Sequence, residues 1–330
     1  FEQDYGRWKE VSEEMAIAIN GFGEDSNTVL RYAQNGLHFD HRRKTDPKVL
    51  RDWMAILAYE FPWFFDKFLE MEDDADSEPD TIVKNHINGK PLSNILLWHA
   101  RCLFSICSHI TPRTVLEIGG GYGAFARLWL TSNIALCDRY YIVDIPESLF
   151  FAEAYLRKHF GDAVGYWKDR DPGTKIVLIP LPSLKDIDLS VDLVISMGSM
   201  QEMTNNWVKF YMDWLDQIKV TFFYSINYAG QPLYEMGESR NLWSPRPSQQ
   251  WTTRLLNPDP PLVRVMCIER PFMEALYEKI PATRSIYEWQ ALKGASMTRA
   301  MYLEGLDLVR QFPSIEAIVL FVKKCRASYR

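Results

Sequence analysis

The residues best suited to bind a ligand form a glycine cluster, Gly119-Gly120-Gly121-Tyr122-Gly123. The apolar run 115–118 before it predicts a strand, and residues 125–130 after it predict a helix. Glycine lets the backbone adopt positive φ and approach a ligand without a Cβ in the way. The helix N-terminus adds unpaired N–H groups at the same place. This order predicts a ligand-binding turn, with a purely structural glycine turn as the alternative.

The carboxylate of Glu117, third in the predicted strand, indicates the charge of that ligand. An acid beside the turn attracts a cation and opposes a diphosphate. It therefore favours S-adenosylmethionine (SAM), which carries an ammonium and a sulfonium, over a nicotinamide dinucleotide. The residues expected to hold SAM here are Glu117, Gly119, Gly121, Tyr122 and Gly123.

Asp144 ends a second predicted strand, 140–144. An acid at this place can accept hydrogen bonds from both ribose hydroxyls of a nucleoside. Nicotinamide and SAM enzymes share this feature, so Asp144 predicts a nucleoside without choosing between them. The alternative is a capping role before Pro146, where the next helix is expected to begin.

Polar residues follow two further predicted strands, 191–196 and 220–228. Because ligands bind at the carboxyl ends of strands in open α/β sheets, Gln201, Asn227 and Tyr228 are predicted to contact the substrate. Glu202 is a candidate for accepting a proton from an attacking hydroxyl. Capping of the following helix is its alternative role.

Two histidines and an arginine precede the glycine cluster. His99 and His86 are further candidates for the catalytic base, and a structural role is the alternative for each. Arg101 could pair with the SAM carboxylate through its planar guanidinium. No His, Asp, Glu or Cys cluster has clear metal-ligand spacing, so no metal is predicted.

The motif Leu116-Glu117-Ile118-Gly119-Gly120-Gly121-Tyr122-Gly123 resembles motif I of the class I SAM-dependent methyltransferases. Residues 142–147, 199–203 and 225–228 resemble the sugar O-methyltransferases, and the resemblance covers about residues 92–228. It implies a Rossmann-like α/β fold with a seven-stranded sheet and SAM as cofactor, with S-adenosylhomocysteine (SAH) as product. It also implies methylation of a sugar or glycan-terminus hydroxyl in surface-polysaccharide biosynthesis, beside a glycosyltransferase domain in a longer chain.

Alternating strands and helices after residue 111 predict parallel βαβ units. Residues 111–330 are therefore expected to form the SAM-binding domain, and residues 1–110 a helical N-terminal cap. Beyond residue 230 we expect a loop over 231–261, a strand over 262–268, a helix over 287–311 and an antiparallel edge strand over 315–322. The loop is the expected determinant of the acceptor.

Composition excludes several classes of protein. The net charge is -6 and no long basic stripe occurs, which argues against a nucleic-acid partner. The five cysteines are scattered, which favours a reducing cytoplasm, and no run reaches the length of a membrane span. The chain begins at Phe1, as an excised domain would. Three alternatives stay open: a small hydroxylated natural product as acceptor, an NAD(P)-dependent oxidoreductase, and a non-catalytic scaffold.

Overall fold

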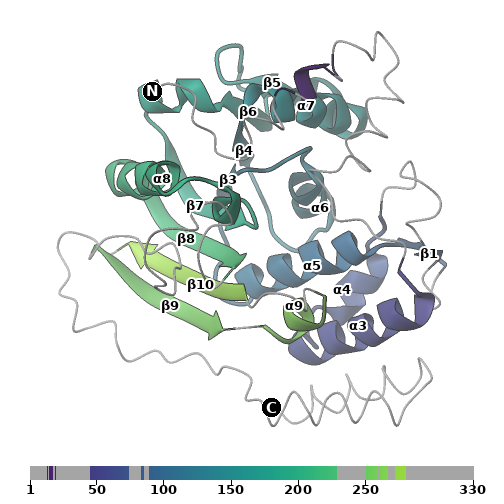
Figure 1. The fold of residues 1–330 in the computed structure, drawn as a ribbon. Coiled ribbons are helices and arrows are strands. Elements are labelled where there is room, and N and C mark those ends of the chain that lie inside the picture. The colour runs from purple at the N-terminus through teal and green to yellow at the C-terminus, as the bar shows by residue number, and fades with distance from the viewer. Residues whose placement is uncertain are drawn as a thin grey trace.

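The computed structural model describes residues 13, 15–17, 19, 45–73, 83–84, 89–228, 250–258, 260–266 and 272–279. Its centre is an eight-stranded sheet in the order β5-β6-β4-β3-β7-β8-β10-β9 (Figure 1). The strands are β3 (Thr114–Ile118), β4 (Arg139–Asp144), β5 (Val164–Tyr166), β6 (Ile176–Pro180), β7 (Ser190–Met197), β8 (Lys219–Tyr228), β9 (Trp251–Pro258) and β10 (Phe272–Lys279).

The direction of the strands identifies the fold. The six strands β5, β6, β4, β3, β7 and β8, in their order in the sheet, pair in parallel. Strand β10 runs antiparallel to both β8 and β9. The chain moves outward from β3 to β4 and β6, then returns to add β7 and β8 on the other side of β3. This reversal between β3 and β7 is the switch point at which doubly wound sheets bind ligands. The predicted Rossmann-like α/β fold is confirmed, with eight strands in place of seven because the short β5 extends one edge.

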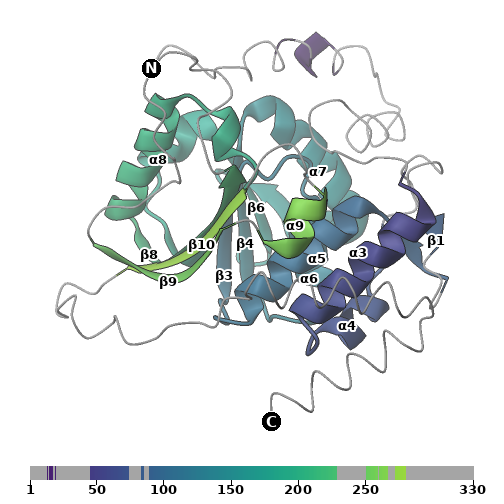
Figure 2. The same ribbon diagram turned by 60° about the horizontal axis from the view of Figure 1, so that its bottom comes forward.

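Helices cover both faces of the sheet (Figure 2). They are α3 (Pro47–Glu60), α4 (Phe65–Glu70), α5 (Asn94–Cys107), α6 (Ala124–Thr131), α7 (Pro146–Phe160), α8 (Asn205–Gln217) and α9 (Pro261–Met266), with 3-10 turns η1 (Gly161–Ala163), η2 (Leu181–Asp186) and η3 (Met200–Glu202). Alternate strand residues serve two cores. Val115 and Ile142 join the helices α3 to α7 and α9, whereas Leu116 and Val143 join α8.

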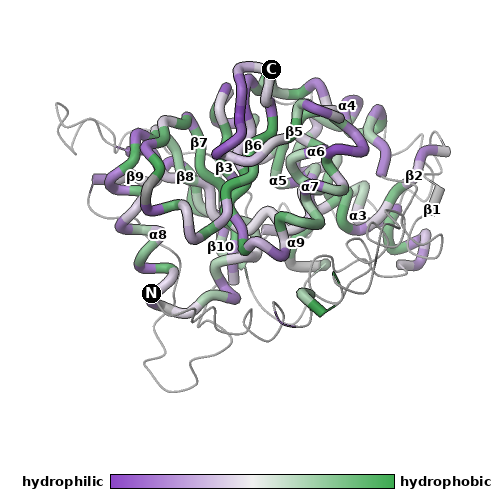
Figure 3. The backbone as a smooth tube through the Cα atoms, turned by 90° about the horizontal axis from the view of Figure 1, so that it is seen from above, coloured by the Kyte–Doolittle hydropathy of each residue, from purple (hydrophilic) through white to green (hydrophobic). Residues whose placement is uncertain are grey.

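Hydropathy follows this arrangement of one sheet between two layers of helices. Green, hydrophobic stretches run through the central strands and helices, and many purple, hydrophilic stretches lie toward the periphery (Figure 3).

Local signals fix the helix ends: Ser93 Oγ accepts from the backbone N–H of Leu96 (3.2 Å) at the start of α5, and Pro146 begins α7. Within the described ranges, no helix has both the length and the apolar character needed to cross a membrane.

Two predictions for the later part of the chain are wrong. Residues 262–268 were expected as a strand, but Pro261–Met266 form the helix α9, because Pro261 occupies the first helical turn, where its missing N–H is tolerated. Within the predicted loop 231–261, Trp251–Pro258 form β9. In the described part of the sheet, β10 runs antiparallel to both of its neighbours, β8 and β9. The helix expected over 287–311 and the strand expected over 315–322 lie outside the described residues.

The N-terminal region is helical where it is described, as predicted, apart from a two-stranded ribbon of β1 (Val83–Lys84) and β2 (Pro91–Leu92). Its helices are joined to the strand β10 and to the helix α9 by buried polar contacts. Arg101 of α5 forms two hydrogen bonds to Glu274 of β10, of 2.6 and 2.7 Å, and Glu60 of α3 accepts from the N–H of Leu262 (3.1 Å). The domain boundary at residue 110 stays a prediction.

Candidate active site

The glycine turn joins β3 to α6 at the carboxyl edge of the sheet. Gly119, Gly121 and Gly123 have φ angles of 73°, 55° and 90°, a region that side chains with a Cβ rarely adopt. Space is also restricted: a Cβ on Gly119 would lie 2.4 Å from the Cβ of Ser199. The sequence therefore needs glycine here for both conformation and close approach, and the predicted order of strand, glycine turn and helix is present.

Glu117 lies directly beneath this turn. A Cβ placed on Gly120 would lie 3.1 Å from Glu117 Oε2, and the carboxylate is buried, with 3% of the residue exposed. The Tyr140 hydroxyl donates to Glu117 Oε2 at 2.9 Å, and Asp144 is close enough for its charge to act on Glu117. Burial raises the pKa of Glu117 from 4.5 to about 7, despite the Tyr140 hydrogen bond, and the charge of Asp144 adds to the rise. Among the described residues, Glu117 has no cationic partner.

Asp144 connects the end of β4 to the same turn. Its Oδ2 accepts from the Gly121 N–H at 2.9 Å, and its Oδ1 accepts from the Ile145 N–H at 2.7 Å. Burial raises its pKa to about 6, against the lowering effect of these backbone hydrogen bonds. Glu147, in the first turn of α7, contributes a repulsive charge, and its buried Oε2 has no hydrogen-bond partner among the described residues. The carboxyl ends of β3 and β4 thus present acids and backbone N–H groups.

The segment after β7 is fixed to both neighbouring strands. Ser199 Oγ donates to the Ile118 carbonyl at 2.7 Å, and Gln201 Oε1 accepts from the Tyr228 N–H at 2.8 Å. The Asn227 amide donates to Ser225 Oγ at 2.9 Å. The side chains of Gln201 and Asn227 are buried in these contacts, so they hold the segment, and their predicted contact with substrate stays untested.

Glu202 ends η3, within this fixed segment, and is partly exposed. Its backbone N–H donates to the Ser199 carbonyl at 3.1 Å, which ties its position to a residue that touches Gly119. Glu202 and the glycine turn therefore belong to one continuous set of contacts across the switch point.

The other predicted residues are distributed differently. His99 of α5 packs edge-on against Phe125 of α6, with ring centroids 5.5 Å apart, whereas His86 lies outside the described residues. The Tyr122 ring is buried against Tyr155 (4.8 Å), so only its backbone is available to a ligand at the turn.

Arg101 is buried in an ionic network with Glu274 and Glu60. Although burial lowers its pKa, the attraction of Glu274 and Glu60 raises that pKa well above its ordinary value. Burial raises the pKa of Glu274, but Arg101 more than offsets this effect, so that pKa is lowered overall. Because its guanidinium is used by these carboxylates, we do not include Arg101 in the cofactor site proposed below.

Sequence reasoning missed two residues of the site, Tyr140 and Ser199. Strand alternation could have placed Tyr140 on the same face as Asp144, but its contact with Glu117 depends on the register of β3 and β4. Ser199 lies in the 199–203 segment of the resemblance, but its role was not predicted, since that role comes from the absence of a side chain on Gly119. In the described ranges, no three metal-ligating side chains come together.

Comparison with known proteins gives structural matches only. No family model and no curated protein matches the chain. The N-methyltransferase NodS from Bradyrhizobium japonicum WM9 has 12% identity and a TM-score of 0.41, covering 56% of this chain and 95% of that one. Phosphoethanolamine N-methyltransferase 1 from Haemonchus contortus has 16% identity and a TM-score of 0.38, covering 64% and 46%. Mitomycin 7-O-methyltransferase MmcR has 14% identity and a TM-score of 0.35, covering 56% of each chain.

Proposed function

We propose that this chain is a SAM-dependent O-methyltransferase that acts on a hydroxyl of a sugar or of a glycan end. The observation that supports SAM as the cofactor is the environment of Glu117. Its buried carboxylate lies beside a glycine turn and has no cationic partner among the described residues. A buried charge is costly unless it is paired. The ammonium group of SAM would supply that pair, whereas a diphosphate would be repelled by Glu117 and Asp144.

The remaining groups fit the rest of the cofactor. Asp144 would accept hydrogen bonds from the ribose hydroxyls, and the backbone at Gly121 and Gly123, which carries no Cβ, would let the methionine part approach closely. When bound, the cofactor supplies a methyl group on a sulfonium, which reacts with an oxygen nucleophile without further activation.

Within this proposal, the protein positions the acceptor and removes its proton. Glu202 would accept the proton of the acceptor hydroxyl, so that its oxygen could take the methyl group that the cofactor would supply. Ser199 and Gln201 hold the turn that carries Glu202 against β3 and β8, so little rearrangement is needed for the reaction. His99 is the alternative base.

Calorimetric titration with SAM and with SAH tests the cofactor, with NADH as the competing ligand. We expect micromolar binding of both sulfur compounds and none of NADH. Asp144→Ala should weaken SAH binding by roughly tenfold or more, because charged hydrogen bonds contribute about 1.5–3 kcal/mol each. Asp188→Ala, at an exposed position in the loop before β7, is the matched control and should bind normally. NADH binding without SAH binding would exclude the proposal.

A further inference from the structure

Three aromatic side chains from three elements meet at the carboxyl end of β8. Phe272, the first residue of β10, is buried, with 4% exposed. The Tyr228 ring lies 4.6 Å from the Phe272 ring, and the Trp98 ring of α5 meets Phe272 edge-on at 5.3 Å. Trp98 and Tyr228 are both partly exposed. We call these three residues the aromatic wall.

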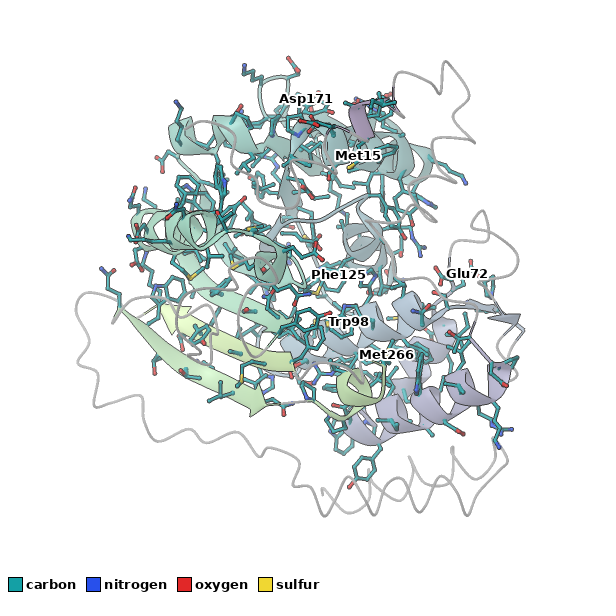
Figure 4. The ribbon with its side chains drawn as sticks, viewed as in Figure 1. Met15, Glu72, Trp98, Phe125, Asp171 and Met266 are labelled. Carbon is teal, nitrogen blue, oxygen red and sulfur yellow. The ribbon has the colours of Figure 1, made fainter. Side chains whose placement is uncertain are left out.

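The aromatic wall adjoins the turn that carries Glu202. The backbone N–H of Tyr228 donates to Gln201 Oε1, and Gln201 immediately precedes Glu202. Figure 4 shows Trp98 between α5 and the ends of β8 and β10, with Phe125 of α6 nearby. The aromatic wall therefore lies beside the proposed base. It is at the carboxyl edge of the sheet, the edge at which α6 also begins.

Trp98 has a polar group that the described part of the protein does not use. Its indole N–H makes no hydrogen bond there, although one side of the ring is held by Phe272. Tryptophan and tyrosine with one packed side and one polar edge are well suited to bind ligands, since large apolar contact is combined with a directed hydrogen bond.

The charges near the wall restrict the acceptor. Glu202 is a carboxylate, and the cation of the nearby α5, Arg101, is already paired with Glu274. A phosphate beside this wall would meet the charge of Glu202, and the guanidinium of Arg101 is already engaged by Glu274 and Glu60. An uncharged ring with an apolar face and hydroxyls around its rim avoids this repulsion. Its face can pack against the aromatic rings, and its hydroxyls can donate to Glu202 and accept from Trp98.

We propose that Trp98, supported by Phe272 and together with Tyr228, determines acceptor specificity by binding the C–H face of a sugar ring that carries no phosphate. This inference rests on the proposed function. It adds to that function the residues that recognise the acceptor, and it specifies that the acceptor is uncharged.

The test begins with the wild-type protein and SAM. One panel contains methyl glycosides of neutral pyranoses, a second contains the corresponding sugar phosphates, and a third contains simple phenols. Mass spectrometry scores the gain of one methyl group. We expect methylation in the first panel. Methylation confined to sugar phosphates or to phenols, or in no panel by protein that binds SAM, would overturn the inference.

Variants then assign the role of Trp98 with the methylated glycoside as acceptor. Trp98→Ala should raise the acceptor KM by about tenfold, the loss expected for one aromatic contact. Trp98→Phe keeps the ring and removes the N–H, so it should restore part of the affinity. The Kd of SAH should change by less than about twofold in both variants, since Trp98 is assigned to the acceptor and not to the cofactor.

Trp63→Ala is the control, because Trp63 lies 51% exposed between α3 and α4. Its acceptor KM should equal that of the wild type. An unchanged acceptor KM in Trp98→Ala, with SAH binding intact, would refute the role of the wall while leaving the proposed function in place. Failure of the wild type to bind SAH is a different result and would remove the proposed function itself.

Discussion

The Glu117 carboxylate accepts a hydrogen bond from a tyrosine hydroxyl and has a second acid as its neighbour. In this buried position its ionised form is stabilised by a cation and destabilised without one. Its raised pKa, about 7, means that much of it holds a proton at neutral pH before the cofactor binds. Pairing with an ammonium requires the ionised form. Cofactor binding should therefore release a proton, which is a property of this residue and not of the fold.

We predict that SAM affinity rises with pH between about 5.5 and 7 and then levels off, because Glu117 ionises over this range. Calorimetry in phosphate and in imidazole buffer at pH 6.5 would measure the proton release as a difference in binding enthalpy. Glu117→Gln should bind more weakly and abolish the buffer dependence. Tyr140 and Asp144 are the titratable groups facing Glu117, and equal proton release in Glu117→Gln would assign the effect to Asp144 instead.

Glu202 differs from Glu117 because it is partly exposed and belongs to the acceptor side. We predict that Glu202→Gln lowers kcat by about 10²–10⁴-fold, the usual contribution of a general base. Its SAH affinity should stay within about twofold of the wild type, since the amide preserves the shape of the side chain. Rates measured with the methylated acceptor would check this. Full activity in Glu202→Gln would transfer the role of base to His99.

At the level of elements, the contact between the glycine turn and the segment after β7 is the joint of the site. Gly119→Ala would place a Cβ 2.4 Å from Ser199 Cβ and force a side chain into φ 73°. We predict a loss of unfolding free energy of about 1–3 kcal/mol for the clash, together with weaker SAH binding. Urea denaturation and calorimetry measure the two effects.

The double variant Gly119→Ala/Ser199→Gly separates the two causes. Removal of the Ser199 side chain relieves the clash but leaves the positive φ at position 119. Because Ser199→Gly also removes the hydrogen bond to the Ile118 carbonyl, the single variant Ser199→Gly is the reference. Gly119→Ala should cost less stability in the Ser199→Gly background than in the wild type, and the cost that remains measures the backbone strain. If Gly119→Ala costs the same in both backgrounds, the turn is limited by its backbone alone, and the steric contact with Ser199 is irrelevant.

Sequence alone predicts the elements of this site better than their contacts. The run from Glu117 to Gly123 predicts strand, turn and helix because period, composition and glycine agree locally. The pairing of Tyr140 with Glu117, or of Gln201 with the Tyr228 N–H, depends on strand order and register, which are set by long-range packing. β9 and α9 were missed for another reason: Pro, Trp and Asn within and around them resemble loop composition, and α9 has only six residues.

At the level of the whole molecule, buried polar groups join the N-terminal helices to the sheet. Glu274 receives hydrogen bonds from Arg101 of α5 and from Tyr224 of β8 (2.7 Å), and Asn257 of β9 donates to it at 3.0 Å. A helical cap that only rested on the sheet would not need such contacts. The helices α3 and α5 are therefore part of the same packed unit as β8 to β10, which places Trp98 and His99 at fixed positions beside the site.

This shared core makes the global stability of the protein sensitive to the charge of its site. Glu117 has a pKa raised from 4.5 to about 7, so it binds more protons in the folded than in the unfolded state between these values. The free energy of unfolding therefore falls as pH rises from about 4.5 to 7, by about 3 kcal/mol for such a shift. Asp144, raised to about 6, acts in the same direction, whereas the lowered pKa of Glu274 acts in the opposite direction at lower pH.

We predict that urea denaturation of the protein without cofactor shows decreasing stability between pH 5 and 7.5, and that Glu117→Gln flattens this dependence. Saturating SAH should also flatten it, since its ammonium replaces the proton as the partner of Glu117. Asp188→Ala keeps the wild-type dependence if the effect belongs to the site. A dependence that persists unchanged in Glu117→Gln would mean that the folded protein already neutralises this carboxylate, and the physical reason for a cationic cofactor would then be lost.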